Sequence, residues 1–78
     1  MAEPAQIEKI ITESLITFGA DADQINRDAE LEALDIDSLD LAELSQIIEE
    51  QFGVELTSSD VAEIRTVGDA IDLVVERA

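Results

Sequence analysis

The sequence predicts an all-α protein, a small four-helix bundle with three main helices, one short helix and a long loop between helices one and two. Three observations favour this class. Apolar residues recur at three- and four-residue spacing in three separate segments, capping residues stand where helices would begin, and no alternation of apolar and polar residues is long enough to indicate a strand. With 78 residues the chain has room for one compact unit, and we expect a single domain spanning residues 1–78.

The first helix is expected from about Pro4 to about Gly19. Proline suits the first turn of a helix, because the N–H that it lacks would have no helical partner there. The apolar residues of this segment fall on one helical face and are Ile7, Ile10, Ile11, Leu15 and Phe18.

Residues 19–37 are expected to form a long connection. The segment contains turn formers ("GADAD" and "NRD"), and its apolar residues follow no sustained period. A connection of this length is uncommon in a compact domain unless its own side chains pack it or it serves a function. We therefore expect Ile25, Leu31 and Leu34 to hold it against the core, and the connection to be ordered in part.

The second helix is expected from Ser38 to Phe52, and Gly53 is a natural stop for it. Its apolar residues form one stripe, and its acidic residues lie largely away from that stripe. The stripe consists of Leu41, Leu44, Ile47, Ile48 and Phe52, and the acidic residues are Asp40, Glu43, Glu49 and Glu50. We therefore expect a helix that is apolar towards the core and acidic towards solvent.

Two capping patterns mark the starts of the remaining helices. Thr57 is followed three residues later by Asp60, a spacing typical of reciprocal caps at helix N-termini. The same spacing joins Thr66 to Asp69. The first pair introduces a brief helix, and the second introduces the last main helix. The apolar stripe of the last helix is Val67, Ala70, Ile71, Val74 and Ala78.

The interior is expected to be small and aliphatic, since the chain contains two Phe and no Trp or Tyr. Such an interior can repack without large aromatic rings obstructing it. The residues assigned to the core are Leu41, Leu44, Ile48, Ile64, Ile71 and Val74.

The chain is strongly acidic, with 20 acidic residues, 4 basic residues and a formal net charge of −16. This charge disfavours nucleic acid and anionic membrane surfaces and favours partners with basic patches. The absence of His and Cys removes both a side chain that titrates near neutral pH and a thiol nucleophile, so we expect no catalysis by the chain itself. No apolar run approaches a membrane span and the N-terminus does not resemble a signal peptide, which predicts a soluble, cytoplasmic protein.

Ser38 follows Asp37 in the segment "LEALDIDSLDLAEL", at the expected start of the second helix. The plainest interpretation is that Ser38 is the N-cap, because its hydroxyl can accept a hydrogen bond from a free N–H in the first turn. A catalytic serine would need a base, and the chain offers neither a His nor a nearby Ser-Lys arrangement. The third interpretation is attachment of a phosphate-linked group, because a helix N-terminus favours negative charge.

Two aspartates near Ser38 bear on this third interpretation. Asp37 and Asp40 would repel an attached phosphate unless a divalent cation or a basic partner intervenes during its transfer. Cations such as Mg²⁺ prefer oxygen ligands and suit carboxylate and phosphate together. The acidity around Ser38 is therefore explained if attachment needs a metal ion.

The run "LDIDSLDLAELSQIIEEQFGVEL" resembles the central motif of acyl carrier proteins, in which the serine of Asp-Ser-Leu bears 4′-phosphopantetheine. The resemblance covers nearly the whole chain, from a first amphipathic helix and a long loop to "QFGVEL" after the acidic helix and a final "IRTVGDAIDLV". An Asp-Ser-Leu triplet alone is a weak signal, but its place in this order makes the match specific. The resemblance points to a discrete carrier of a type II fatty-acid or polyketide synthase.

This resemblance implies roles for the residues of the motif. Ser38 would carry 4′-phosphopantetheine from coenzyme A, and Asp37 would help bind a divalent metal ion while a phosphopantetheinyl transferase attaches it. The thiol of the arm would hold acyl or polyketide intermediates as thioesters, and the core could open to shelter an acyl chain. Ketosynthase, acyltransferase and other synthase enzymes with basic docking patches would bind the monomeric carrier on its second helix. The residues matched to that docking face are Leu39, Asp40, Glu43, Gln46, Glu49 and Glu50.

Three positions depart from a typical bacterial fatty-acid carrier. Asp35 stands where that group often has Gly, Ser45 where it has Val, and Gln46 where it often has Met. These departures favour a polyketide or other specialised pathway slightly, and they leave Ser38 and Asp37 untouched. No role for Asp35 follows from the sequence.

Other classes remain open. Peptidyl carriers usually have Gly-Gly-His-Ser-Leu or Gly-Gly-Asp-Ser-Leu and are less acidic, whereas D-alanyl carriers are also small and acidic. A calcium loop opening at Asp21 would place Ile25 and Asn26 where a ligand and a Gly are needed, and one opening at Asp35 fails in a similar way. A plain acidic interaction domain would leave Ser38 unmodified.

Overall fold

The computed structural model describes residues 3–78, so the first two residues of the expected 1–78 domain lie outside the described part. Over this range all regular secondary structure is helical, and strand-like pairing is limited to one isolated bridge between Glu30 and Thr66. The elements are α1 (Pro4–Thr17), the 3-10 turns η1 (Ala22–Gln24) and η2 (Glu32–Leu34), α2 (Ser38–Phe52), the short α3 (Ser58–Glu63) and α4 (Val67–Arg77). The predicted class, with three main helices and one short helix, is confirmed.

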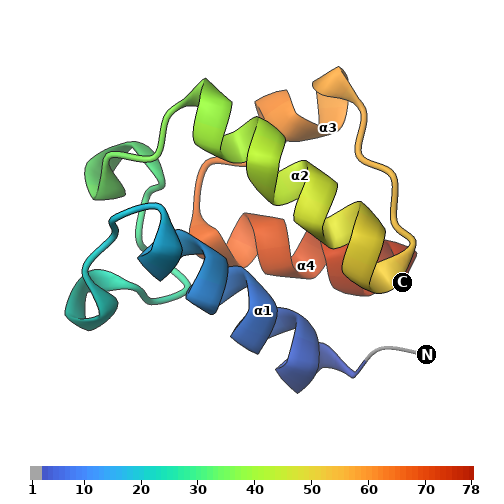
Figure 1. Ribbon diagram of the computed structural model, residues 1–78, viewed down its shortest axis with the longest axis horizontal. Coiled ribbons are helices and arrows are strands. Elements are labelled where there is room, and N and C mark those ends of the chain that lie inside the picture. Colours follow the sequence, from blue (N-terminus) through green and yellow to red (C-terminus); the bar gives the residue numbers. More distant parts are fainter. Residues whose placement is uncertain (1–2) are drawn as a thin grey trace.

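The three main helices lie side by side, with α1 running against α2 and α4 (Figure 1). The connection between α1 and α2 covers one end of the bundle, and α3 lies beside the first half of α2. This arrangement places the start of α2 between the connection and α3. Among the helices of residues 3–78, none is long and apolar enough to cross a membrane.

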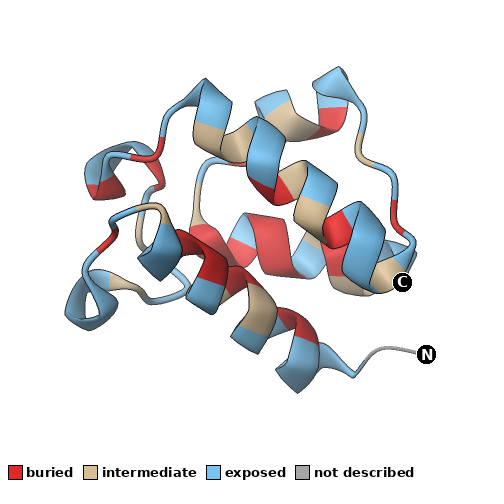
Figure 2. Cartoon of the chain, in the orientation of Figure 1, coloured by how far each residue is buried: buried red, intermediate tan, exposed pale blue. Residues whose placement is uncertain are grey.

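The core lies where the inner faces of α1, α2 and α4 meet, as the red surfaces in Figure 2 show. Its largest fully buried side chains come from all three helices and are Ile7, Ile11, Leu15, Leu44, Ile48, Val67 and Val74. Of the six residues predicted for the core, Leu41 alone is half-buried, and the other five are buried. The placement of Ala78 in the apolar stripe of α4 is wrong, because the helix ends at Arg77 and Ala78 is exposed.

The connection packs against the core and is bound to the start of α4. Leu31 and Leu34 are buried as predicted, and Ile25 is half-buried. Three backbone hydrogen bonds between residues 27–31 and 65–68 join the two segments, at N to O distances of 2.9, 3.0 and 2.9 Å. One of them runs from the Gly68 N–H to the Arg27 carbonyl, and a Cβ at position 68 would lie 2.9 Å from the same oxygen. Only a glycine lets the connection approach α4 this closely.

Local signals define where the helices begin and end. Thr57 and Thr66 are the N-caps of α3 and α4, and each forms a reciprocal capping box with the aspartate three residues later, as predicted. Gly53 ends α2 with a φ of 70°, in the left-handed region that glycine adopts without strain. Thr57 and Thr66 thus fix where α3 and α4 begin, and Gly53 fixes where α2 ends.

Candidate functional site

Ser38 is the first residue of α2, and the cap before it is Asp37. The Asp37 Oδ1 accepts the Asp40 N–H at 3.0 Å, and the Asp37 N–H donates to Asp40 Oδ2 at 3.3 Å. The interpretation of Ser38 as the N-cap is therefore wrong. Asp37 has the extended backbone of a cap, and its carboxylate takes the N–H that the Ser38 hydroxyl was expected to take. Ser38 is left with no capping role.

The environment of Ser38 favours an attached anion. Ser38 is exposed, and it lies at the N-terminus of a helix of 15 residues. The first N–H groups of a helix carry a partial positive charge, which stabilises negative groups within the first turn. The exposed position leaves the Ser38 hydroxyl open to an enzyme, while the helix end would stabilise a phosphodiester placed on it.

A groove of about 340 Å³ runs from Ser38 between α2 and α3. Its α2 wall contains Ala42 and Ser45, whose Oγ donates to the Leu41 carbonyl at 3.0 Å. The opposite wall comes from the start of α3 and the residue before its cap. The residues of that wall are Leu56, Thr57, Ser58 and Val61. A flexible group attached to Ser38 would therefore begin at the mouth of a groove with both apolar and hydroxyl surfaces.

A second hollow of about 320 Å³ lies between the connection and α2. Its apolar surface comes from Leu31, Ile36, Leu41 and Ile64, and Arg65 stands at its rim with two glutamates of the connection. Leu41 borders this hollow, which explains why a residue predicted for the core is only half-buried.

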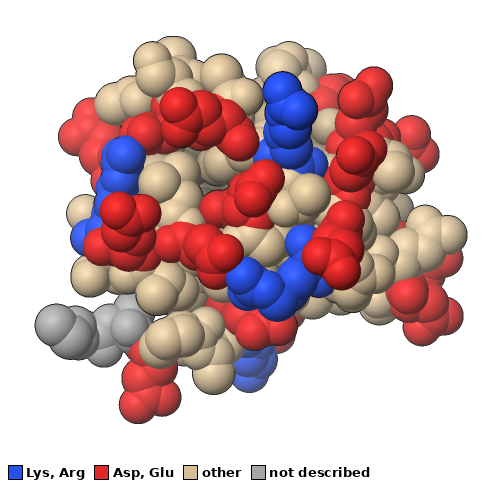
Figure 3. All heavy atoms as spheres, turned by 180° about the vertical axis from the view of Figure 1, so that it is seen from behind, with Lys and Arg blue, Asp and Glu red and all other residues tan. Residues whose placement is uncertain are grey.

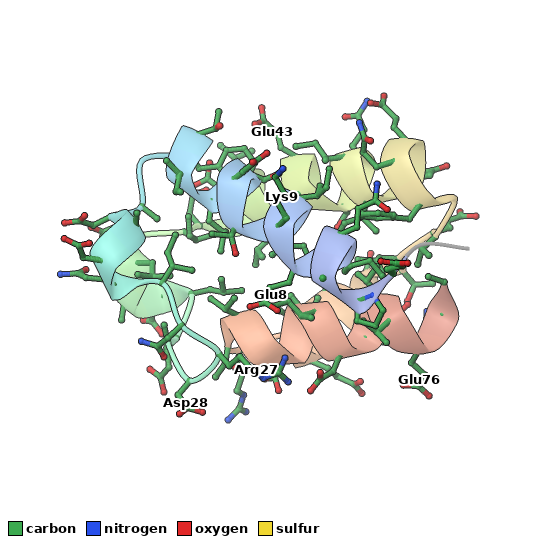
Figure 4. All side chains as sticks on the ribbon, turned by 90° about the horizontal axis from the view of Figure 1, so that it is seen from below. Glu8, Lys9, Arg27, Asp28, Glu43 and Glu76 are labelled. Carbon is green, nitrogen blue, oxygen red and sulfur yellow. The ribbon has the colours of Figure 1, made fainter. Side chains whose placement is uncertain are left out.

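The outer face of α2 carries most of the residues predicted to dock partners (Figure 2). Leu39 is 75% exposed, and it is the residue next to Ser38. Glu43 lies one turn further along and projects from the edge of the molecule, away from α4 (Figure 4). Gln46, Glu49 and Glu50 are also exposed. This face combines one apolar side chain with a row of polar and acidic ones.

Asp40 differs from the rest of the predicted docking residues. It is half-buried, and its carboxylate closes the capping box with Asp37. Asp40 therefore has a structural role at the start of α2 in addition to the docking role predicted for it.

Asp37 lies beside Ser38 but belongs to no ready-made metal site. Across residues 3–78, no group of three or more acidic side chains is placed to hold a metal ion. A divalent ion at Asp37 would need further oxygen ligands from a phosphate, from water or from another protein.

Asp35 has a structural role that sequence reasoning missed. It adopts the left-handed conformation, with φ 61° and ψ 29°, at the end of η2. Its N–H donates to the Glu32 carbonyl at 3.1 Å, and the Ile36 N–H donates to Leu31 at 3.0 Å. Aspartate tolerates this conformation better than most residues, though less well than glycine. The turn buries Ile36 and leads the chain into the cap of α2. The glycine expected at this position from the resemblance described above was the available signal.

Asp60 and Arg77 form a second feature that the sequence did not reveal. The guanidinium binds the carboxylate through two contacts, Nη1 to Oδ2 at 2.5 Å and Nη2 to Oδ1 at 2.7 Å. Asp60 is 8% exposed, and hydrogen bonds from Arg77 and Thr57 lower its pKa from 3.8 to about 2. The pair joins the start of α3 to the end of α4. The two residues are 17 positions apart, beyond any local pattern.

On the face seen in Figure 3, carboxylates outnumber basic groups, and the basic side chains lie among them. Arg27, in the connection, contacts Asp72 of α4 at 2.7 Å, and this bond raises the pKa of Arg27 above its ordinary value. The side chains of this pair are 52% and 67% exposed, so its net contribution to stability is small. The surface therefore favours approach by positively charged partners.

Comparisons with known proteins agree with this geometry. The family model described as "Phosphopantetheine attachment site" matches residues 10–74, which include the connection, α2, α3 and most of α4. The chain is 40% identical over 72 residues to an acyl carrier protein of Chlamydia caviae, covering 91% of this chain and 90% of that protein. It is 38% identical over 78 residues to an acyl carrier protein of Solidesulfovibrio magneticus, covering 99% and 96%. The similarity extends over the whole bundle.

Proposed function

The chain belongs to the acyl carrier protein family, and we propose that Ser38 is the residue that bears its 4′-phosphopantetheine arm. One observation carries the proposal: the cap of α2 is Asp37, so the hydroxyl of Ser38 is exposed at the helix N-terminus without a structural duty. The helix end stabilises a phosphodiester at that hydroxyl. The groove that begins at Ser38 leaves room for the arm along α2 and α3.

Asp37 is proposed to assist the loading of Ser38 by a phosphopantetheinyl transferase. Its carboxylate is adjacent to Ser38, is exposed, and uses Oδ1 to cap the helix. In this role Asp37 supplies one oxygen ligand to a divalent cation, and the phosphate and the transferase supply others, because the carrier alone has no group of acids that could hold a metal over residues 3–78. Because these ligands come from three partners, the metal ion would bind only while the transferase attaches the phosphopantetheine.

The loaded arm supplies a thiol on which acyl or polyketide intermediates are held as thioesters. The residues of this chain hold the arm, expose it and direct it, and we propose that they take no chemical part in the reactions. The carrier is expected to act in the cytoplasm, as a monomer, for a fatty-acid or polyketide synthase. The departures that slightly favour a specialised pathway are Asp35, Ser45 and Gln46. Ser45 lies on the wall of the groove that Ser38 also lines, and Gln46 is exposed on α2.

The outer face of α2 is proposed as the docking surface for the transferase, ketosynthase, acyltransferase and other synthase enzymes. Leu39 offers an apolar anchor that is 75% exposed, and Glu43, Glu49 and Glu50 lie further along the same helix. Charges on such a surface speed association with basic patches and lose effect as salt screens them. Leu39 lies next to the proposed attachment residue, so docking there would present Ser38 to the enzyme.

Intact-mass spectrometry tests the proposal. After incubation with coenzyme A, Mg²⁺ and a phosphopantetheinyl transferase of broad specificity, we expect the mass to rise by one phosphopantetheine group. Ser38→Ala should abolish the rise. Ser58→Ala is the matched control, because Ser58 is also exposed, also begins a helix and lines the same groove. An unchanged mass with several transferases, or a rise that survives Ser38→Ala, would contradict the proposal and favour an unmodified interaction domain.

A further inference from the structure

The short helix α3 has little to hold it in place. It has six residues, well below the length at which an isolated helix is stable in water. Its one buried residue is Asp60, a carboxylate, and none of the apolar residues of Ser58–Glu63, all of which the structure describes, belongs to the buried core. Its position must therefore come from the flanking chain, from its cap and from the contact that Asp60 makes.

That contact joins α3 to a helix that is firmly anchored. Arg77 is the last residue of α4, which buries Val67, Ala70, Ile71 and Val74 in the core. The Asp60 carboxylate accepts three hydrogen bonds, two from the Arg77 guanidinium and one from the Thr57 N–H. Charge-assisted bidentate hydrogen bonds fix the relative orientation of the two side chains as well as stabilising the contact. The guanidinium therefore sets where the start of α3 sits relative to α4.

The start of α3 is also one wall of the groove beside Ser38. Thr57, the capping partner of Asp60, and Val61, the residue after it, both line this groove. A shift of Asp60 would therefore move the groove wall. We propose that Asp60 and Arg77 are positioning residues that hold α3 against α2 and so set the width of the groove available to the group on Ser38, an inference that rests on the function proposed above.

A second ion pair of the same residue types provides the control. Arg27 binds Asp72 at 2.7 Å, but it joins the connection to α4 and touches no part of the groove. Its side chains are 52% and 67% exposed, against 40% and 11% for Arg77 and Asp60. Arg27→Gln and Arg77→Gln make the same change of charge, and both leave the capping boxes intact. Changing Asp60 itself would remove the capping box of α3 as well, so Arg77 is the better target.

The first measurement is amide hydrogen exchange in the unloaded protein. The N–H groups of Val61 and Ile64 form hydrogen bonds at the two ends of α3, to the carbonyls of Thr57 and Val61 respectively. Arg77→Gln is expected to speed exchange of these amides by about tenfold while the amides of α1 change little. Arg27→Gln should leave the exchange rates of these α3 amides at their wild-type values. Arg77→Lys keeps the charge without the two-pronged geometry and should give an intermediate rate, which also serves if Arg77→Gln folds poorly.

The second measurement uses the protein loaded with acetyl or octanoyl thioesters. If α3 shields a cargo in the groove, the octanoyl thioester should hydrolyse more slowly than the acetyl thioester in the wild type. Arg77→Gln should then lower the ratio of the acetyl hydrolysis rate to the octanoyl hydrolysis rate by severalfold. A purely structural role would lower the melting temperature and leave the ratio unchanged. The inference is overturned if α3 exchanges equally in the two Gln variants, or if the hydrolysis ratio is the same in both. The mass gain of the wild type tests the proposed function separately, so the two can fail independently.

Discussion

The carboxylate of Asp37 accepts the backbone N–H of Asp40 at 3.0 Å, and this bond caps the helix that Ser38 begins. Capping of α2 and the proposed attachment of the phosphate-linked group therefore fall to two neighbouring residues and not to one serine. Asp37 starts the helix, and Ser38 is exposed at its positive end. Asp37 can therefore be substituted while the hydroxyl of Ser38 stays in place.

Asp37→Asn is expected to separate capping from metal binding. Asparagine caps helices as well as aspartate does, so the free energy of unfolding should change by only a few tenths of a kcal/mol, whereas Asp37→Ala should cost about 1 kcal/mol. The amide is a poorer ligand for Mg²⁺ than a carboxylate, so loading of Asp37→Asn should be slower and need more Mg²⁺. Urea unfolding and initial loading rates at several Mg²⁺ concentrations measure the two effects. Normal loading of Asp37→Asn would remove the metal role of Asp37.

Reversing charge on the outer face of α2 should weaken docking. Glu43→Lys with Glu50→Lys is expected to lower the association rate with the transferase by about tenfold at low salt, and by much less at high salt. Stopped-flow kinetics at two salt concentrations measure this effect. The control reverses Glu13 and Asp23, exposed carboxylates on α1 and η1, for the same change in net charge. Equal losses in both double variants would show that net charge, and not this face, governs association.

Asp35 should respond to substitution according to its left-handed backbone. Asp35→Gly is expected to keep or raise the free energy of unfolding, and Asp35→Ala should be about 1 kcal/mol less stable than Asp35→Gly. Asp35→Asn removes the same charge but tolerates the conformation, so it separates backbone strain from relief of charge repulsion. Chemical denaturation of the three variants makes the comparison. Equal stability of the Ala and Gly variants would contradict a strained turn.

The Asp60 carboxyl should make its stabilising contact dependent on pH. Its pKa of about 2 in the folded protein lies below the ordinary 3.8, because Arg77 and Thr57 bind the ionised form. A carboxyl of this kind stabilises the fold fully above its unfolded pKa and loses that effect as pH falls through the folded value. The melting temperature of Arg77→Gln should be lower than that of the wild type by about 4 °C at neutral pH. That difference should hold down to about pH 5 and shrink between about pH 4 and pH 2.

The melting temperature of Arg77→Gln must be compared with that of the wild type at each pH, because many other carboxyls titrate in the same range. Glu63 and Glu76 lie near Arg77, and both are present in each protein. Protonation of the acidic surface also relieves repulsion in both. A melting difference as large at pH 2.5 as at pH 7 would show that the Asp60–Arg77 contact does not depend on the ionised carboxyl.

Features encoded by neighbouring residues were predictable from the sequence, and those that depend on distant ones were not. Thr57, Thr66 and Gly53 act through partners within four residues, so their patterns were sufficient to predict the caps. Asp37 and Ser38 are both good capping residues, and only the backbone conformation decides between them. The family motif identified the residues of the proposed site, but the groove beside Ser38 depends on α3, which the chain brings back from 20 positions away.

The three backbone bonds between the connection and α4 also limit how this protein can change in length. Bonds at residues 27, 29 and 31 align the segment with residues 65–68, much as two paired strands are aligned. An inserted residue inside the segment would shift its side chains, and Leu31 would leave the core. The exposed turn around η1 carries no such alignment. Insertions and deletions in the connection should therefore be tolerated before Arg27 and rejected after it.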